Sequence, residues 1–255
     1  DAGIRLVNPG GNFTITNNRI GDGDVGILID NTAGAATSVL TLSGNTIDGT
    51  TLTINEDAVR VSNTSNQSMT VILASSTMTG FTDAGIEVTD TTTGAGQTNL
   101  DFNAGVILNN GARGVVITGP TTGIIGQTFD NLVIGSAAGS ITGNYIELQN
   151  AALHGNPNGT PFDPLEYNAQ NVTFNGVTPN SLNPAGSPAN QATLAGIEGR
   201  IVHYLDTTLA DYNAVPIKNM RGLIRLRTDS FSLDGTVGLN GVQLVLSGAA
   251  HIPIN

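Results

Sequence analysis

Two glutamates are the residues of this chain that could cleave a glycosidic bond. Glu87 lies in the stretch 83–88 and Glu147 in the stretch 146–148. Glycosidases use two carboxyl groups, because an acid and a base must flank the bond. If both glutamates point outward from one column of stacked strands with Val116 between them, their backbones lie roughly 10 Å apart. That separation is close to the one an inverting pair requires.

A structural role is the competing interpretation of Glu87. Arg60 occupies the equivalent position one repeat earlier, so the two side chains would form an ion pair worth under about 1 kcal/mol on an exposed face. The sequence has no Trp and few other aromatic residues to stack against sugar rings. We therefore expect no enzymatic activity. If the chain is an enzyme after all, Glu87 and Glu147 are the candidate catalytic residues.

Acidic residues also recur just before the repeated strands. Asp1, Asp24, Glu56 and Asp83 would stack about 5 Å apart, where like charges repel one another. Turn N–H groups can satisfy such carboxylates. The alternative is Ca²⁺, which prefers hard oxygen ligands. The candidate calcium ligands are Asp22, Asp24, Glu56, Asp57 and Asp83, and we expect no other cofactor.

Other catalytic constellations are absent from the sequence. The three histidines, His154, His203 and His251, have no metal-ligand spacing, and there is no cysteine and no Gly-x-Ser-x-Gly motif. Gly-rich stretches lack the Gly-Lys-Ser/Thr of a phosphate-binding loop. Nucleophilic triads, thiolate metal sites and nucleotide-phosphate sites are therefore not predicted.

A repeated unit must position these residues. Each unit has an apolar-x-apolar pair, a polar loop, a second such pair and a lone apolar residue. The first pairs are Ile4/Leu6, Ile27/Ile29, Val59/Val61 and Ile86/Val88; the second pairs are Phe13/Ile15, Leu40/Leu42, Val71/Leu73 and Leu100/Phe102; the closing residues are Ile20, Ile47, Met78 and Ile107. Alternate residues of a strand face opposite sides, so each pair is a short half-buried strand.

Such units cannot bury their apolar side chains alone and must stack, as the units of solenoid proteins do. We predict an all-β, right-handed parallel β-helix of about six or more coils. A fifth first strand is expected at Val115/Ile117, with Leu132/Ile134 as its second strand. The register beyond residue 118 has two alternatives: stretch 141–146 repeats the end of an earlier unit, or 146–148 is a sixth first strand.

The regular coils are expected over 1–149, followed by a Pro/Gly/Asn-rich excursion with an irregular coil over 150–190. Leu194, Ile197, Ile201, Leu205 and Leu209 form one apolar stripe at helical spacing. The stripe predicts a short α-helix near 190–209, in an insertion or plug over 191–215. Strand patterns return over 216–255. Because a first strand begins at residue 1 without a capping element, we expect this chain to be part of a longer protein.

Charge and composition limit the partners. The formal net charge is −11, with a single lysine, so nucleic-acid binding is not expected. No apolar run is long enough to enter a membrane. The absence of cysteine and the abundance of Thr and Asn are typical of a secreted or surface bacterial protein, so we expect an extracellular or cell-surface location.

The Asp-x-Gly-Ile/Val-x-Val and Leu-x-Gly-Asn-Thr-Ile type repeats of residues 1–148 resemble the pectin-lyase-like parallel β-helix repeats of bacterial secreted and surface proteins. That group includes carbohydrate-active enzymes and adhesin-like proteins. Residues 194–203 together with 222–225 are similar to a segment between β-helix blocks of very large bacterial surface proteins. Neither resemblance implies catalytic residues for this chain.

These observations favour a structural or adhesive segment of a large secreted or cell-surface bacterial protein. It would act as a rigid stalk or fibre-forming unit, present variable loops at one corner to a protein or glycan, and continue or self-associate end to end. One alternative is a polysaccharide-active enzyme or glycan-binding domain. Another is a phage tail-fibre β-helix.

Overall fold

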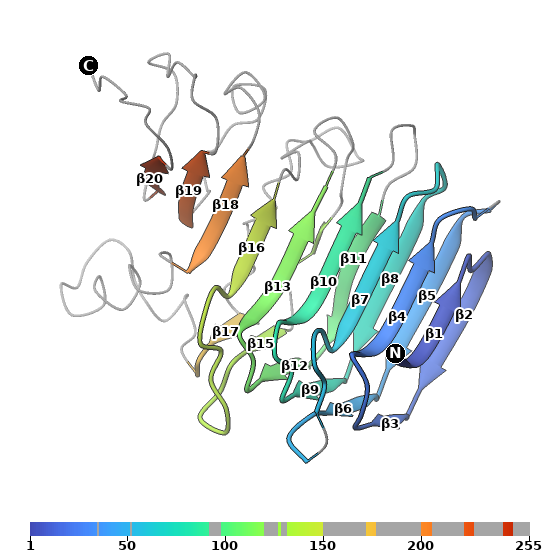
Figure 1. Cartoon of the computed structure of the whole chain (residues 1–255), viewed down its shortest axis with the longest axis horizontal. Helices are drawn as coiled ribbons and strands as arrows, with labels where there is room; N and C mark the ends of the chain where they lie inside the picture. Colours follow the sequence, from blue (N-terminus) through green and yellow to red (C-terminus); the bar gives the residue numbers. More distant parts are fainter. Residues whose placement is uncertain are drawn as a thin grey trace.

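Apolar residues that alternate with polar ones become short parallel strands in the computed structural model of the chain (Figure 1). The structure describes residues 1–34, 36–51, 53–91, 98–119, 127–128, 132–149, 172–176, 200–205, 222–226 and 242–246. Over these residues the chain is all β, and its strands form three parallel sheets that wind as a solenoid.

The largest sheet, sheet A, holds nine strands. In hydrogen-bonded order they are β1 (Ala2–Val7), β4 (Val25–Asn31), β7 (Val59–Asn63), β10 (Ala84–Asp90), β13 (Arg113–Thr118), β16 (Ile146–Gln149), β18 (Ile201–Leu205), β19 (Gly222–Leu226) and β20 (Val242–Leu246).

The other two sheets are smaller. Sheet B consists of β2 (Gly11–Thr16), β5 (Ser38–Ser43), β8 (Met69–Ala74), β11 (Thr98–Ala104) and β14 (Gln127–Thr128). Sheet C consists of β3 (Arg19–Ile20), β6 (Thr46–Asp48), β9 (Thr77–Thr79), β12 (Val106–Asn109), β15 (Leu132–Ile134) and β17 (Val172–Phe174).

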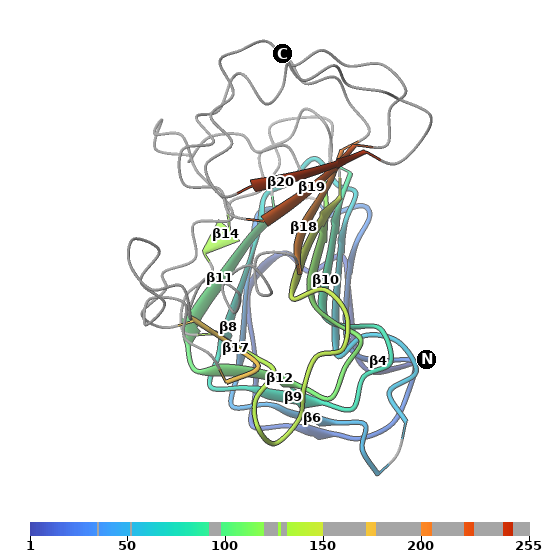
Figure 2. The same ribbon diagram turned by 90° about the vertical axis from the view of Figure 1, so that its left-hand side faces the viewer.

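One coil is a full turn of the solenoid with one strand in each sheet. Coils 1 to 4 are β1–β3, β4–β6, β7–β9 and β10–β12, and coil 5 is β13–β15. Viewed along the stack, sheets A and B face each other across the interior and sheet C joins them at one end (Figure 2). The first and second apolar pairs predicted for coils 1 to 4 therefore lie on the strands expected of them.

Stacked apolar columns fill the interior. In sheet A one column runs Ile4, Ile27, Val59, Ile86 and Val115. The members from Ile27 onward are fully buried, while Ile4 in the edge strand β1 is only partly buried. Phe13 of the edge strand β2 is 38% exposed for the same reason. Each inner coil thus buries its apolar side chains against both neighbours, which is the packing that a solenoid requires.

Close packing explains why glycine occupies the third position of the Asp-x-Gly part of the repeat. A Cβ on Gly26 would lie 2.5 Å from the carbonyl oxygen of Ala58 and 2.7 Å from the Ile47 side chain. Gly114 lies in the equivalent place on β13, and a Cβ there would be 2.3 Å from the Tyr145 carbonyl oxygen. The corner between sheets C and A therefore has no room for a larger residue at Gly26 or Gly114.

Asparagine side chains form hydrogen bonds between coils at the corner where the strands of sheet A end. The Nδ2 group of Asn31 donates to the Oδ1 atom of Asn63 at 3.1 Å, and the Nδ2 group of Asn63 donates to the Oγ1 atom of Thr98 at 3.0 Å. All three residues are buried. Buried polar groups must be hydrogen-bonded, so this ladder fixes the corner in one register.

One closing residue was predicted one position too early. In coil 4, Leu108 stacks on Met78 and is fully buried, whereas Ile107 pairs with Thr77 and is half-buried. The ladder of β11 with β8 shifts between Phe102 and Ala104, which adds one residue before β12. A β-bulge of this kind moves every later side chain to the opposite face.

The prediction for coil 5 was also partly wrong. Leu132 and Ile134 belong to sheet C, on β15, and the sheet B strand of this coil is β14. Of the two registers left open beyond residue 118, the second is confirmed, because Ile146 and Leu148 pair with Val115 and Ile117 as the next strand of sheet A. Within the range expected to hold an irregular coil, Val172–Phe174 form β17.

The predicted helix near 190–209 is wrong over Ile201–Leu205, which form β18 between β16 and β19. Residues 190–199 and 206–209 lie outside the described residues. Beyond residue 216, the described residues form β19 and β20. Among the residues that the structure describes, there is no helix of the length and apolarity needed to cross a membrane.

Candidate functional site

Acidic residues line the corner from which the strands of sheet A begin. The backbone N–H of Asp24 donates to the carbonyl of Asp1 at 3.0 Å, that of Glu56 to Asp24 at 2.8 Å, and that of Asp83 to Glu56 at 3.0 Å. The predicted column of Asp1, Asp24, Glu56 and Asp83 on four successive coils is therefore confirmed.

The outward column of sheet A is also as predicted. Its members pair in the order Arg5, Leu28, Arg60, Glu87, Val116 and Glu147. Glu87 and Glu147 are thus two strands apart with Val116 between them. Val116 is 1% exposed and Glu147 is 6% exposed, so this part of the column is buried and not open to solvent.

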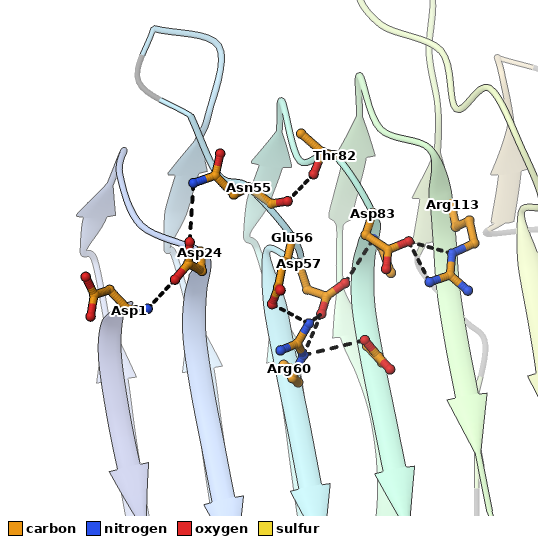
Figure 3. A network of polar contacts seen from close by, with 11 residues as sticks. Asp1, Asp24, Asn55, Glu56, Asp57, Arg60, Thr82, Asp83 and Arg113 are labelled. Carbon is orange, nitrogen blue, oxygen red and sulfur yellow. Dashed lines mark hydrogen bonds and ion pairs between the residues drawn. The ribbon is translucent and has the colours of Figure 1, made fainter.

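An ionic cluster forms where the acidic corner meets the outward column (Figure 3). We use this name for Glu56, Asp57, Arg60, Asp83, Glu87, Arg113 and Glu147. Arg60 on β7 is the first of two centres. Its guanidinium lies 2.6 Å from Asp57 Oδ2, 2.7 Å from Glu56 Oε2 and 3.5 Å from Glu87 Oε2. The predicted Arg60–Glu87 pair therefore exists, as one contact of several.

Arg113 at the start of β13 is the second centre. Its Nε donates to Asp83 Oδ1 at 2.8 Å, and its Nη1 lies 3.3 Å from Glu147 Oε1. Glu147 also accepts a hydrogen bond from Asn144 Nδ2 at 2.9 Å. The arginine therefore connects carboxylates of coil 4 and of the strand after coil 5.

Asp57 is the buried member of the cluster, with a side chain that is 0% exposed. Its Oδ1 atom accepts the backbone N–H of Ala84 at 2.9 Å, across the boundary between coils 3 and 4. Burial, followed by the hydrogen bond and the negative charge of Glu87, raises the pKa of Asp57 to about 7, against the opposing effects of the Ala84 N–H and Arg60. Asp57 is therefore a group that exchanges a proton near neutral pH.

The carboxylates that converge are not the set predicted for calcium. Asp57, Asp83 and Glu87 offer oxygen atoms that all lie within 4.8 Å of one another. Asp24 instead accepts a hydrogen bond from Asn55 at 3.3 Å. Asp22 accepts the N–H of Gly23 at 2.9 Å, and Glu56 pairs with Arg60.

The converging carboxylates do not fit a calcium ion. Arg60 contacts Asp57 and Glu87, and Arg113 contacts Asp83, so two positive guanidinium groups already lie against the oxygen atoms that a cation would need. Ca²⁺ takes six to eight oxygen ligands and is repelled by neighbouring cations. The five candidate ligands are accounted for instead by turn N–H groups, an amide and ion pairs.

The two catalytic candidates are held in separate ion pairs. Glu87 contacts Arg60, and Glu147 contacts Arg113 and Asn144. The side chain of Glu147 is 8% exposed, which leaves little access for a polysaccharide. Their predicted catalytic role gains no support from this arrangement.

Sequence reasoning missed the part played by Arg113 and underrated Asp57. Two residues before the first inward position, the successive coils carry Val25, Asp57, Ala84 and Arg113. Charged residues in a column that otherwise holds small apolar ones are the signal that would have identified both. Of the histidines, His203 lies on β18, while His154 and His251 are outside the described residues.

Comparisons with family models, curated proteins and solved structures find no match for this chain. The functional interpretation of the cluster therefore depends on its own geometry.

Proposed function

We propose that the chain is a structural or adhesive segment of a large secreted or cell-surface bacterial protein, in which the solenoid serves as a rigid stalk or fibre-forming unit. The observation that carries this proposal is the unbroken parallel ladder of sheet A through nine strands. Eight spacings of ~4.8 Å give roughly 38 Å of stacked backbone. Each coil adds length in one direction, which is what a spacer requires.

The use made of polar side chains supports the same proposal. Outward arginines pair with carboxylates of a neighbouring coil, as Arg5 does with Asp30 at 3.1 Å and Arg19 with Asp48 at 3.4 Å. The buried amides of Asn31 and Asn63 likewise connect coils. Charged and polar groups that connect one coil to the next serve the scaffold, and they are not free to bind a substrate.

Loops at the corner between sheets A and B would provide the adhesive contacts. Residues 32–37 connect β4 to β5, and residues 64–68 connect β7 to β8, while the strands on both sides keep their register. Loops that differ between coils on a constant scaffold are where binding usually resides. The partner would be a protein or a glycan.

We further expect a right-handed coil, because parallel crossover connections have that hand in nearly all known cases. The nine strands of sheet A support a count of six or more coils. End-to-end stacking of solenoids through their strand edges would extend the stalk or join it to another copy.

A polysaccharide-active enzyme is the second candidate, favoured by one observation. Asp57, Asp83 and Glu87 bring three carboxylates within 4.8 Å, and a raised pKa is a frequent property of catalytic acids. Against this candidate, Asp57 is fully buried and cannot contact a substrate.

The decisive experiment incubates the chain with a panel of soluble and insoluble polysaccharides and measures released reducing ends and co-sedimentation. The stalk proposal predicts no turnover by the wild-type chain or by Glu87→Gln. Asp101→Asn, which removes a carboxylate on β11 outside the cluster, serves as the matched control. Turnover by the wild type and Asp101→Asn that is lost in Glu87→Gln would replace the stalk with the enzyme. Binding without turnover would support the adhesive form of the proposal.

A further inference from the structure

The ionic cluster carries more negative than positive charge. Five carboxylates (Glu56, Asp57, Asp83, Glu87 and Glu147) face the two guanidinium groups of Arg60 and Arg113. Three of the carboxylates lie within 4.8 Å of one another, and one is fully buried. Like charges at this distance repel strongly where water is excluded, so full ionisation of the cluster is unfavourable. A bound proton relieves that repulsion.

The buried carboxyl group is also a mechanical connection. Asp57 belongs to coil 3, its Oδ1 atom accepts the N–H of Ala84 in coil 4, and its Oδ2 atom contacts Arg60, which reaches on to Glu87 in coil 4. Any change in the charge of Asp57 therefore acts on the contact between two coils. The equivalent position in coil 2 is Val25, a buried apolar residue that offers no such control.

We propose that the ionic cluster is a proton-operated joint of the solenoid: a proton shared between Asp57 and Glu87 holds coils 3 and 4 together, and its loss near neutral pH weakens their contact. The proposal concerns regulation of the solenoid and goes beyond the stalk function. The joint would operate whether the chain is a spacer or an enzyme. The joint proposal and the stalk proposal can therefore fail independently.

The charged groups around Asp57 come from every strand packed against it. Glu56 and Arg60 flank it on its own coil, Asp83 and Glu87 face it from coil 4, Arg113 and Glu147 lie beyond these, and Asp24 precedes it. Burial and Glu87 together raise the pKa of Asp57 to about 7, from an ordinary value of 3.8. At Asp57, the folded chain therefore binds more protons than the unfolded chain between pH ~4 and ~7.

The direction of the effect follows from this difference. Where the folded state binds the extra proton, the free energy of unfolding falls as pH rises, and it levels off once the pH exceeds the folded pKa. Asp48 has a lowered pKa because of its hydrogen bonds to Thr50, so its contribution has the opposite sign and is confined to lower pH.

The test measures urea unfolding of the full chain from pH 5 to pH 8. For the wild type, the unfolding constant should rise with pH by up to about tenfold per pH unit before it levels off above pH ~7. Asp57→Asn keeps an oxygen for the Ala84 N–H but cannot ionise, so its unfolding constant should show much less pH dependence. Glu87→Gln should shift the fall in stability to lower pH, and Asp101→Asn should retain the wild-type profile. Histidine titration is common to all four proteins and cancels in the comparison.

Hydrogen exchange of the Ala84 amide gives a local readout. After correction for the intrinsic pH dependence of exchange, its protection should decrease from pH 5 to pH 8 in the wild type, and by more than the protection of amides in β5. Glu87→Gln shows this local effect at lower pH even if Asp57→Asn does not fold. The proposal is overturned if Asp57→Asn or Glu87→Gln retains the wild-type profile, or if the corrected protection of the Ala84 amide does not fall from pH 5 to 8 in the wild type.

Discussion

Individual polar side chains of this chain connect coils, and their contribution to stability depends on how deeply they are buried. Arg5 and Arg19 form exposed pairs with Asp30 and Asp48, and exposed pairs of this kind contribute between 0 and about 1 kcal/mol. Asn63 is fully buried and makes four hydrogen bonds through its side chain, to Asn31, Ser65, Gln67 and Thr98. Its loss leaves several buried partners without a hydrogen bond.

We therefore predict that Asn63→Ala lowers the free energy of unfolding by about 1–3 kcal/mol or more, because buried polar groups are left unsatisfied. Asn66 lies three residues after Asn63, at an exposed position in a loop. Asn66→Ala should therefore change the free energy of unfolding by less than about 0.5 kcal/mol. Urea denaturation at a single pH compares the two variants. Equal effects would show that the asparagine ladder does not stabilise the corner.

The candidate site could be predicted only in part. The repeat placed Arg60 and Glu87 side by side and stacked Asp24, Glu56 and Asp83, because these positions depend on the period alone. Arg113 was missed because its contact with Asp83 crosses from the strand to the corner of the preceding coil. Side-chain reach across columns is not visible in the spacing of a repeat.

Strands of this solenoid are specified by which face of each strand is apolar. In β8, Leu73 points into the core and is fully buried, whereas its neighbour Ile72 lies on the outer face in the column of Thr41 and Asp101. Two large apolar residues next to each other in one strand therefore have different environments.

Leu73→Ala should cost about 2–5 kcal/mol of stability because it leaves a cavity in the packed interior. Ile72→Ala should cost under about 1 kcal/mol, since its side chain is only half-buried. Thermal and urea unfolding of both variants test the register of sheet B. A larger loss of stability for Ile72→Ala than for Leu73→Ala would mean that the inner and outer faces of sheet B are exchanged.

Glycine at the corner offers a second test at the level of elements. Gly26→Ala places a methyl group 2.5 Å from the Ala58 carbonyl oxygen, so it should destabilise the chain by about 1–3 kcal/mol or prevent folding. Gly105→Ala meets no atom within 4 Å and should be close to neutral. Circular dichroism and urea midpoints distinguish the two. A neutral Gly26→Ala would show that the corner is wider than the structure indicates.

The strands of coils 1 to 4 could be predicted because alternation and period agree there. The helix prediction failed over Ile201–Leu205 for a specific reason: Ile201 and Leu205 are spaced by four, and four residues suit one face of a helix and equally one face of a strand. The closing residue of coil 4 failed because Val106, Ile107 and Leu108 are all apolar, so the sequence does not show the bulge that selects Leu108.

At the scale of the whole molecule, the coils are repeated units stacked along one axis. Asp24 and Glu56 occupy equivalent places at the corner, where the N–H of Glu56 donates to the carbonyl of Asp24 at 2.8 Å. Deleting residues 25–56 therefore joins Asp24 to Asp57 and removes one complete coil, so that β1–β3 stack on β7–β9. A deletion of 25–40 removes about half a coil and should not fold.

The most direct measurement is the distance between spin labels at Arg19→Cys and Thr173→Cys, determined by pulsed electron paramagnetic resonance. The two positions share the outward column of sheet C and are separated by five strand spacings, or roughly 24 Å of backbone. The chain has no cysteine of its own, so the labels are unique. A rigid solenoid predicts one narrow distribution that shortens by roughly 5 Å when residues 25–56 are deleted. A broad distribution, or a distance that the deletion leaves unchanged, would contradict the account.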